Sequence, residues 1–352
     1  MPEENLVPPP SDGPPRDEFE AVPPATVPVP MNPEQAEWFA GAFARLVGHV
    51  GAALIGKPDV VALVLQAMLA EGHVLLEDAP GTGKTSLAKA LAATVQGTSS
   101  RIQFTPDLLP SDVTGVTIYD QRTQEFEFHR GPVFASIVLA DEINRASPKT
   151  QSALLEVMEE GRITIDGVAH SVGRPFLVLA TQNPIETAGT YRLPEAQLDR
   201  FLVKTSIGYP DLDATEAILA GTGTRASQPS LSAMITTDAV SDMTDLASTV
   251  HIEPAVLRYI AVLAEATRDH ESVRIGVSVR GAIALVRIAR VRAASLGRHY
   301  VLPDDIKALL APVWQHRIVL DPEAEYSGMT AEAVLARVSS TVDAPLHRSA
   351  SE

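Results

Sequence analysis

Short apolar runs alternate with helical patterns along the first two thirds of the chain. Five of these runs have the length and composition of buried strands: residues 74–76, 102–104, 137–140, 176–181 and 201–207. Strands that alternate with helices usually form a parallel sheet with helices on both faces. We therefore predict an α/β fold with an αβα core built on a five-stranded, mostly parallel sheet. Its ligand should bind at the carboxyl edge of the strands.

Helical patterns precede and follow these strands. Asn32 is a favourable N-cap, Pro33 suits the first helical position, and helices are predicted over residues 36–50 and 58–70. After Tyr209-Pro210 every pattern is helical: residues 213–219, 237–248, 253–270, 278–296, 303–310 and 330–338. We predict that residues 33–209 form the α/β core and that residues 210–345 form a separate all-helical domain.

Two segments have the alternating pattern of β-hairpins. Residues 116–120 and 125–129 alternate apolar and polar side chains around a four-residue turn, and residues 162–172 do so around Asp166-Gly167. Asp-Gly is a strong signal for a two-residue hairpin turn. Both segments are predicted to be hairpin insertions, and ordinary edge hairpins without a direct role are the alternative.

Composition narrows the class of protein. The 352 residues are 45% hydrophobic, which is enough for a large core, and the net charge is −16. Nucleic acid is an unlikely partner of an acidic chain, because phosphate contacts require Lys and Arg. Cysteine is absent, which excludes disulfides and thiol catalysis. No apolar run reaches the roughly 18 residues of a membrane span, and the N-terminus lacks the pattern of a secretory signal. A cytoplasmic location is therefore expected.

The two ends of the chain differ from the rest in composition. Residues 1–32 contain ten prolines, six acidic residues and one arginine. Such a segment cannot bury enough apolar surface to order itself, so we predict a disordered proline-rich tail. A docking peptide for a partner protein is the functional alternative. Residues 346–352 are predicted to be a short polar tail.

A glycine-rich turn joins the first predicted strand to a predicted helix in residues 73–86, HVLLEDAPGTGKTS. This arrangement is typical of a P-loop, in which backbone N–H groups and a helix N-terminus bind phosphate. Lys84 is predicted to reach the β- and γ-phosphates, and the hydroxyl of Thr85 to bind Mg²⁺. The strict pattern has glycine six residues before the lysine, where this chain has Asp78.

Acidic and amide side chains follow two other predicted strands. Asp141 and Glu142 end the apolar run of SIVLADEINRA. Asp141 is placed to hold Mg²⁺ and Glu142 to activate the attacking water as a general base. Asn183 follows the strand at 176–181 and can orient this water or contact the γ-phosphate.

Two arginines complete the candidate phosphate-binding residues. Arg200 precedes the last strand and can stabilise charge on the transferring phosphoryl group, with a salt bridge to Glu195 or Asp199 as the structural alternative. Arg280 begins a helix of the second domain, from which it can reach back to the nucleotide and couple that domain to the phosphate state. The acidic pair Glu159-Glu160 precedes a glycine, which indicates a helix end.

Several segments resemble, in their order along the chain, the motifs of the MoxR family of AAA+ ATPases: GTGKT, LADEINRA, TQNPIE, LPEAQLDRF and SVRG. The intervening segments FTPDLLPSDVTG and MEEGRITIDG resemble this family as well. The resemblance covers about residues 32–345. It implies a P-loop AAA+ core and a helical lid, assembled as a ring that is usually a hexamer. It also implies that the two hairpins are inserts that line or approach the pore of the ring.

The resemblance assigns roles to individual residues. Lys84 and Thr85 correspond to Walker A, Asp141 and Glu142 to Walker B, and Asn183 to sensor 1. The resemblance thus implies that these five residues surround the nucleotide phosphates of their own chain.

The arginines receive roles in the same way. Arg200 corresponds to an arginine finger that acts on the ATP of the neighbouring subunit, Arg280 to sensor 2, and Arg145 to a position that can face the subunit interface. The predicted catalytic residues are Lys84, Glu142, Asn183, Arg200 and Arg280. The predicted nucleotide-binding residues are Ile55, Gly56, Asp78, Ala79, Pro80, Gly81, Thr82, Gly83, Lys84, Thr85, Ser86, Asp141 and Arg280, with Ile55 and Gly56 near the adenine. The predicted Mg²⁺ ligands are Thr85 and Asp141.

MoxR-like proteins are thought to be chaperone-like remodelling ATPases, often beside proteins with von Willebrand A domains. The resemblance therefore implies ATP and Mg²⁺ as cofactors, self-association into a ring, and protein clients. A magnesium-chelatase-like motor subunit and a DNA-acting AAA+ motor are the alternatives, and salt-sensitive DNA binding would favour the second. A nucleotide-dependent scaffold with negligible turnover is a further interpretation, against which the presence of Glu142 argues.

Overall fold

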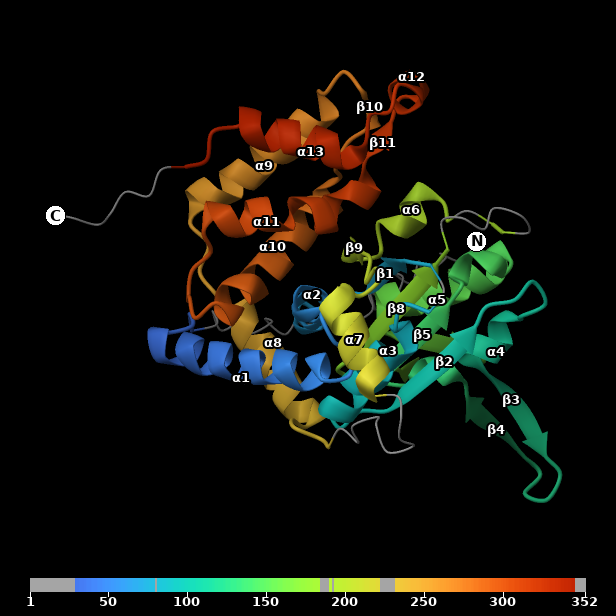
Figure 1. The fold of residues 1–352 in the computed structure, drawn as a ribbon. Helices are drawn as coiled ribbons and strands as arrows, with labels where there is room; N and C mark the ends of the chain where they lie inside the picture. Colours follow the sequence, from blue (N-terminus) through green and yellow to red (C-terminus); the bar gives the residue numbers. More distant parts are fainter. Residues whose placement is uncertain (1–28, 80, 184–189, 192, 222–231, 346–352) are drawn as a thin grey trace, which may run out of the picture.

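A computed structural model of the chain describes residues 29–79, 81–183, 190–191, 193–221 and 232–345 (Figure 1). Pro80, the predicted tail up to residue 28 and the polar tail at 346–352 lie outside these residues. The last two residues of the predicted tail belong to the fold, because Met31 is buried and Asn32 caps the first helix. The predicted boundary of the tail at residue 32 is therefore slightly too late.

The central sheet has five strands in the order β2-β5-β8-β1-β9, and all neighbouring pairs are parallel. This confirms the predicted five-stranded parallel sheet. The strands are β1 (Val74–Glu77), β2 (Ser99–Gln103), β5 (Ile137–Asp141), β8 (Leu177–Gln182) and β9 (Val203–Thr205).

Alternate residues of these strands pack on opposite faces of the sheet. Val74 and Leu76 join the hydrophobic cluster of helices α1 (Pro33–Gly51), α2 (Pro58–Leu69) and α3 (Lys84–Thr94), whereas Leu75 joins the cluster of α5 (Pro148–Glu160). Both faces are covered, as the apolar composition of the strands predicts for a parallel sheet.

Helix α1 begins with a capping box, in which Asn32 and Gln35 each accept a hydrogen bond from the backbone N–H of the other. This confirms the predicted start of the helix. Helix α2 also packs against α8 (Thr237–Ser248), and both α1 and α2 pack against α10 (Val279–Ser295) of the C-terminal part. The hydrophobic cluster on this face of the sheet therefore continues into the helical C-terminal part.

Both predicted hairpins are present. One consists of β3 (Gly115–Asp120) and β4 (Glu125–Arg130), the other of β6 (Arg162–Ile165) and β7 (Val168–Ser171). Asp166 and Gly167 have φ values of 51° and 80°, the left-handed pair that a type I′ turn requires. The β3–β4 hairpin projects from the body of the molecule (Figure 1). The remaining short elements of the core are α4 (Pro110–Thr114), α6 (Glu195–Leu198) and the 3₁₀ turns Pro132–Phe134 and Ile143–Arg145.

The C-terminal part is mainly helical but not entirely so. Two short strands, β10 (Val273–Ile275) and β11 (Val319–Leu320), pair antiparallel, so the prediction of an all-helical domain is wrong at this point. The described helices are α7 (Leu212–Gly221), α8, α9 (Pro254–Arg268), α10, α11 (Pro303–Trp314), α12 (Pro322–Tyr326) and α13 (Ala331–Thr341), with a 3₁₀ turn at Gln315–Arg317. None of the helices among the described residues has the length and apolar character to cross a membrane.

His73 lies directly before β1 and is buried between α5 and the central sheet. Its Nε2 lies 3.0 Å from the carbonyl oxygen of Met158, and the N–H of Val178 donates to its Nδ1 at 3.1 Å. Burial lowers the pKa of His73 from 6.5 to about 4. An unfolded chain therefore takes up a proton on this residue at a higher pH than the folded protein does.

We expect this difference to make the protein less stable as the pH falls from 6.5 towards 4. Between pH 7 and pH 5 the contribution of His73 to the free energy of unfolding should fall by about 2 kcal/mol. Urea unfolding of wild type and His73→Gln at both pH values measures it, because the variant should lose about that much less. His316, whose pKa burial also lowers, contributes equally to both proteins. An identical pH dependence in the two proteins would contradict the prediction.

Candidate functional site

The glycine-rich loop lies between β1 and α3 at the carboxyl edge of the sheet. Gly81 and Gly83 both have positive φ, 86° and 97°. A Cβ atom on Gly83 would also lie 2.8 Å from Cδ1 of Leu54, so both conformation and space require glycine there. Helix α3 begins at Lys84, with Thr85 and Ser86 in its first turn. The loop thus has the geometry of a phosphate-binding P-loop.

Lys84 folds back over this loop. Its Nζ donates hydrogen bonds to the carbonyl oxygens of Asp78 at 3.2 Å and Ala79 at 3.0 Å. The hydroxyl of Thr82 also donates to Ala79, at 3.4 Å. The ammonium group is therefore held over the loop by weak neutral acceptors, which a phosphate oxygen can replace.

Asp78, the departure from the strict P-loop pattern, faces away from the phosphate-binding side. Its carboxylate accepts hydrogen bonds from the N–H groups of Ile207 at 2.7 Å and Gly208 at 2.9 Å, and the residue is buried. Asp78 was predicted to belong to the nucleotide-binding loop, and its carboxylate is engaged by these backbone groups. It anchors the start of the loop to the segment after β9, and a carboxylate directed at phosphate would be repelled.

Asp141 and Glu142 lie at the end of β5, beside the end of β8. The hydroxyl of Thr181 donates to Oδ1 of Asp141 at 2.6 Å, and Arg101 of β2 forms an ion pair with Oδ2 at 2.6 Å. The parallel sheet explains both contacts, because β5, which ends at Asp141, lies between β2 with Arg101 and β8 with Thr181. Asp141 and Thr85 supply carboxylate and hydroxyl oxygens, the hard donors that suit Mg²⁺.

Glu142 has a left-handed backbone, with φ of 56°. Its Oε2 accepts hydrogen bonds from Gln103 at 2.8 Å and from Arg145 at 2.9 Å, and its N–H donates to the hydroxyl of Thr181. A left-handed non-glycine residue costs of the order of 1–3 kcal/mol and is found preferentially at functional sites. The carboxylate that was predicted to be a general base is thus fixed at the tip of the strand.

The other predicted nucleotide-binding residues lie around the same edge. Asn183 follows β8, whose register with β1 pairs Glu77 with Gln182, so Asn183 and the start of the P-loop are at the same level. Gly56 packs against the side chain of Ala214 in α7, and Ile55 beside it is partly exposed. The loop between α1 and α2 therefore borders both the P-loop and α7.

Arg200 and Arg280 share one carboxylate. Nε of Arg200 lies 3.1 Å from Oε2 of Glu159, at the end of α5, and Arg280 forms an ion pair with Oε1 of the same residue. The expected alternative partners of Arg200, Glu195 and Asp199, are not its partners in these ion pairs. The three side chains line a cleft of about 410 Å³ between the core and the helical part.

This arginine pair lies at the opposite edge of the sheet from the P-loop. Arg200 precedes β9, which pairs with β1 from its first residue, and Leu202 donates to the carbonyl of His73. The length of strand β1 alone separates the amino edge of the sheet, where Arg200 lies, from the carboxyl edge, where the P-loop lies, by about 10 Å. Arg280 is therefore held by Glu159 in this cleft and not at the P-loop of its own chain, to which it was expected from the sequence to reach back. Arg200 lies in the same cleft.

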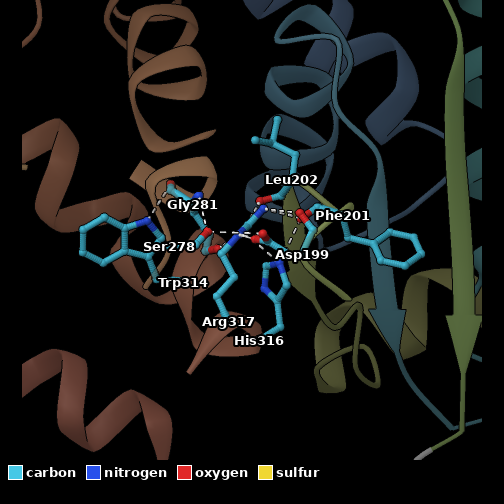
Figure 2. Close-up of polar contacts among 9 residues, drawn as sticks. Asp199, Phe201, Leu202, Ser278, Gly281, Trp314, His316 and Arg317 are labelled. Atoms are coloured by element: carbon cyan, nitrogen blue, oxygen red, sulfur yellow. Dashed lines mark hydrogen bonds and ion pairs between the residues drawn. The ribbon is translucent and has the colours of Figure 1, made fainter. Parts of the chain in front are cut away.

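A buried network beside Arg200 was not predicted. Arg317 pairs with Asp199 at 2.6 Å and donates to the carbonyl oxygens of Phe201 and Leu202 at 2.7 Å and 3.3 Å (Figure 2). Glu159 and Arg101 contact predicted site residues, and Arg317 binds the residues on either side of Arg200 in the chain. None of the three was assigned a role in the site from the sequence.

Comparison with known proteins identifies the family. Residues 73–203 match the family model described as the ATPase family associated with various cellular activities (AAA), and residues 265–338 match the AAA lid domain. The chain is 40% identical over 310 residues to Chaperone MoxR1 of Mycobacterium tuberculosis, across 86% of this chain and 82% of the relative. The chain belongs to the MoxR family of AAA+ ATPases.

Other relatives of this MoxR-family protein agree with the assignment. Protein MoxR of Paracoccus denitrificans is 33% identical over 84% of this chain and 93% of its own length. The uncharacterised protein YeaC of Bacillus subtilis is 48% identical over 87% of this chain and 96% of its own length. The crystal structure of a candidate ATPase from Cytophaga hutchinsonii superposes with a TM-score of 0.83 at 36% identity, over 89% of this chain and 98% of that one. The αβα core and helical lid are therefore the fold of the family.

Proposed function

We propose that this protein hydrolyses ATP as a ring in which Arg200 of one chain completes the phosphate site of its neighbour. The main support for the proposal is that the P-loop lies at the carboxyl edge of the sheet, whereas the arginine pair lies at the amino edge of the same sheet. A chain with both halves of a site, neither within reach of the other, can use them together only across an interface between copies. Because Arg280 shares Glu159 with Arg200, we assign it to the neighbouring nucleotide as well.

Within each site the residues have different roles. Backbone N–H groups of the loop and the ammonium group of Lys84 bind the phosphates, and Thr85 and Asp141 would hold Mg²⁺. When bound, Mg²⁺ neutralises developing charge on the phosphate oxygens. Glu142 accepts a proton from the attacking water, and Asn183 orients this water. Ile55 and Gly56 border the adenine.

We infer that ATP hydrolysis drives chaperone-like remodelling of protein partners. Support comes from the relative named Chaperone MoxR1 and from the net charge of −16, which disfavours nucleic acid as a partner. We propose six chains for the ring, a protein with a von Willebrand A domain as the client, and the cytoplasm as the location. The exposed hairpin β3–β4 offers Phe126, three quarters exposed, as a contact for clients.

The test is the steady-state ATPase rate per chain as a function of protein concentration, with Mg²⁺ present. We expect the rate to rise steeply with concentration and then to saturate, because the site is completed on assembly. A constant rate, with a monomer found by size-exclusion chromatography at the same concentration, would overturn the proposal. A constant rate with a ring at the lowest concentration would agree with it.

A further inference from the structure

We propose that Arg317 is a positioning residue that holds Arg200 and Arg280 as one rigid unit. In this role it lets the core and the lid of one chain present both arginines together to the nucleotide of the next chain. The inference rests on the proposed function, because it concerns the two arginines that are assigned there to the neighbouring site.

The first observation is what the guanidinium of Arg317 binds. Nε pairs with Oδ1 of Asp199 at 2.6 Å, and Nη2 donates to the carbonyl oxygens of Asp199 at 3.1 Å and Phe201 at 2.7 Å. Nη1 donates to Leu202 at 3.3 Å. Figure 2 shows Asp199, Phe201 and Leu202 around the guanidinium of Arg317. These residues flank Arg200 on both sides along the chain, so Arg317 fixes the backbone from which Arg200 extends.

The second observation links the same cluster to Arg280. The other carboxylate oxygen of Asp199, Oδ2, accepts a hydrogen bond from the hydroxyl of Ser278 at 3.2 Å. Ser278 is the N-cap of α10, and it accepts the N–H of Gly281 at 3.1 Å. Arg280 lies in this first turn. Asp199 therefore connects Arg317 directly to the helix start that carries Arg280.

The third observation is that local packing is shaped around Arg317. A Cβ on Gly281 would lie 2.8 Å from Cδ of Arg317, so glycine in the SVRG motif leaves room for this side chain. Trp314 donates its indole N–H to the carbonyl of Gly281 at 2.9 Å and is fully buried (Figure 2). The end of α11 is thus locked against the start of α10.

Stability alone is a weak reason for this arrangement. The side chain of Arg317 is 3% exposed, and a buried ion pair is often no more stabilising than apolar residues of similar volume. A planar fork with five N–H donors does, however, fix the direction of several carbonyl groups at once. Most of these carbonyl groups flank Arg200, which a positioning role explains and a packing role does not.

Arg317→Lys tests the inference, because lysine keeps the charge but has no fork. We expect kcat for ATP hydrolysis to fall at least tenfold, while KM and the affinity for a fluorescent ATP analogue stay within about twofold, since the variant's own P-loop is unchanged. A parallel fall in analogue affinity and kcat would indicate general damage to the fold and overturn the positioning role.

Mixed rings then show on which side the defect lies. Glu142→Gln chains lack the base but retain both arginines in place. They can therefore complete the nucleotide site of a neighbouring Arg317→Lys chain, which keeps its base. Mixed in equal amounts with Arg317→Lys, they should restore up to about a quarter of the wild-type rate per chain, because half of the chains keep a working base and half of those have a Glu142→Gln neighbour. Arg200→Ala mixed with Glu142→Gln is the control.

The outcomes separate the inference from the proposed function. Recovery in both mixtures supports the role of Arg317. Recovery in the control alone overturns the inference and leaves the proposed function intact. No recovery in the control overturns the assignment of Arg200 to the neighbouring site, and the inference with it.

A second pair of variants, each a smaller change than Arg317→Lys, tests the inference in case that variant misfolds. Ser278→Ala and Thr330→Ala each remove an exposed N-cap in the lid, but only Ser278 also contacts Asp199. We expect similar shifts in melting temperature, with a several-fold lower kcat in Ser278→Ala and an unchanged kcat in Thr330→Ala. Equal kcat values in the two variants would contradict the link from Asp199 to α10.

Discussion

Replacing Arg200 with alanine should reduce kcat for ATP hydrolysis by about 10³ while ATP binding stays close to wild type. The guanidinium lies at the opposite sheet edge from its own P-loop, so its loss leaves the phosphate-binding groups of the same chain unchanged. In an assembled ring it is expected to stabilise charge on the phosphoryl group of the neighbouring ATP. Steady-state turnover and equilibrium binding of a fluorescent ATP analogue separate the two effects.

Arg174→Ala is a suitable comparison for this variant. Arg174 lines the same cleft and is ion-paired with Glu71 at 2.7 Å and Asp245 at 2.9 Å, so its charge is engaged within the chain. Its removal should change kcat far less than removal of Arg200. If ATP binding were lost together with turnover in Arg200→Ala, Arg200 would have a structural role. Equal losses of kcat in the two variants would show that the cleft needs its arginines for packing alone.

The layered core could be predicted because its strands carry a strong local signal. Runs such as residues 137–140 are apolar on both faces, and a strand buried between two helical layers accommodates this pattern. The pair β10–β11 was missed because strands of three and two residues are too short for alternation to be visible. Met31 was assigned to the tail because a single apolar residue beside prolines carries no periodic signal.

The candidate site was predictable where one segment supplies both its position and its chemistry. The P-loop and the Asp141-Glu142 pair each follow a strand, and the strand itself places them at the carboxyl edge of the sheet. Glu159 was interpreted as a helix end, which it is, but its partners Arg200 and Arg280 are distant in sequence. Arg317 and the amide contacts of Asp78 also depend on tertiary packing. Such contacts leave no trace in local sequence patterns.

The second large effect is expected from Glu142→Gln, which should lower kcat by about 10² to 10⁴ without weakening ATP binding. Glutamine has nearly the same shape as glutamate, and its Oε1 can still accept the hydrogen bond that Arg145 donates to Glu142. The left-handed backbone at this position is equally open to both residues, so the substitution should remove the base and little else. Bound ATP should then persist, and size-exclusion chromatography with ATP should show a more stable ring.

A comparison with Glu323→Gln isolates the chemical role of Glu142. Glu323 is an exposed residue of α12, which lies away from the five-stranded sheet (Figure 1), so this variant changes the net charge by the same amount at a distant position. Its turnover should equal that of wild type. Wild-type turnover in Glu142→Gln would exclude Glu142 as the base. Loss of ATP binding in that variant would instead mean that the hydrogen bonds of Glu142 to Gln103 and Arg145 maintain the phosphate site. Loss of turnover with ATP retained therefore distinguishes proton transfer by Glu142 from a structural role at the tip of β5.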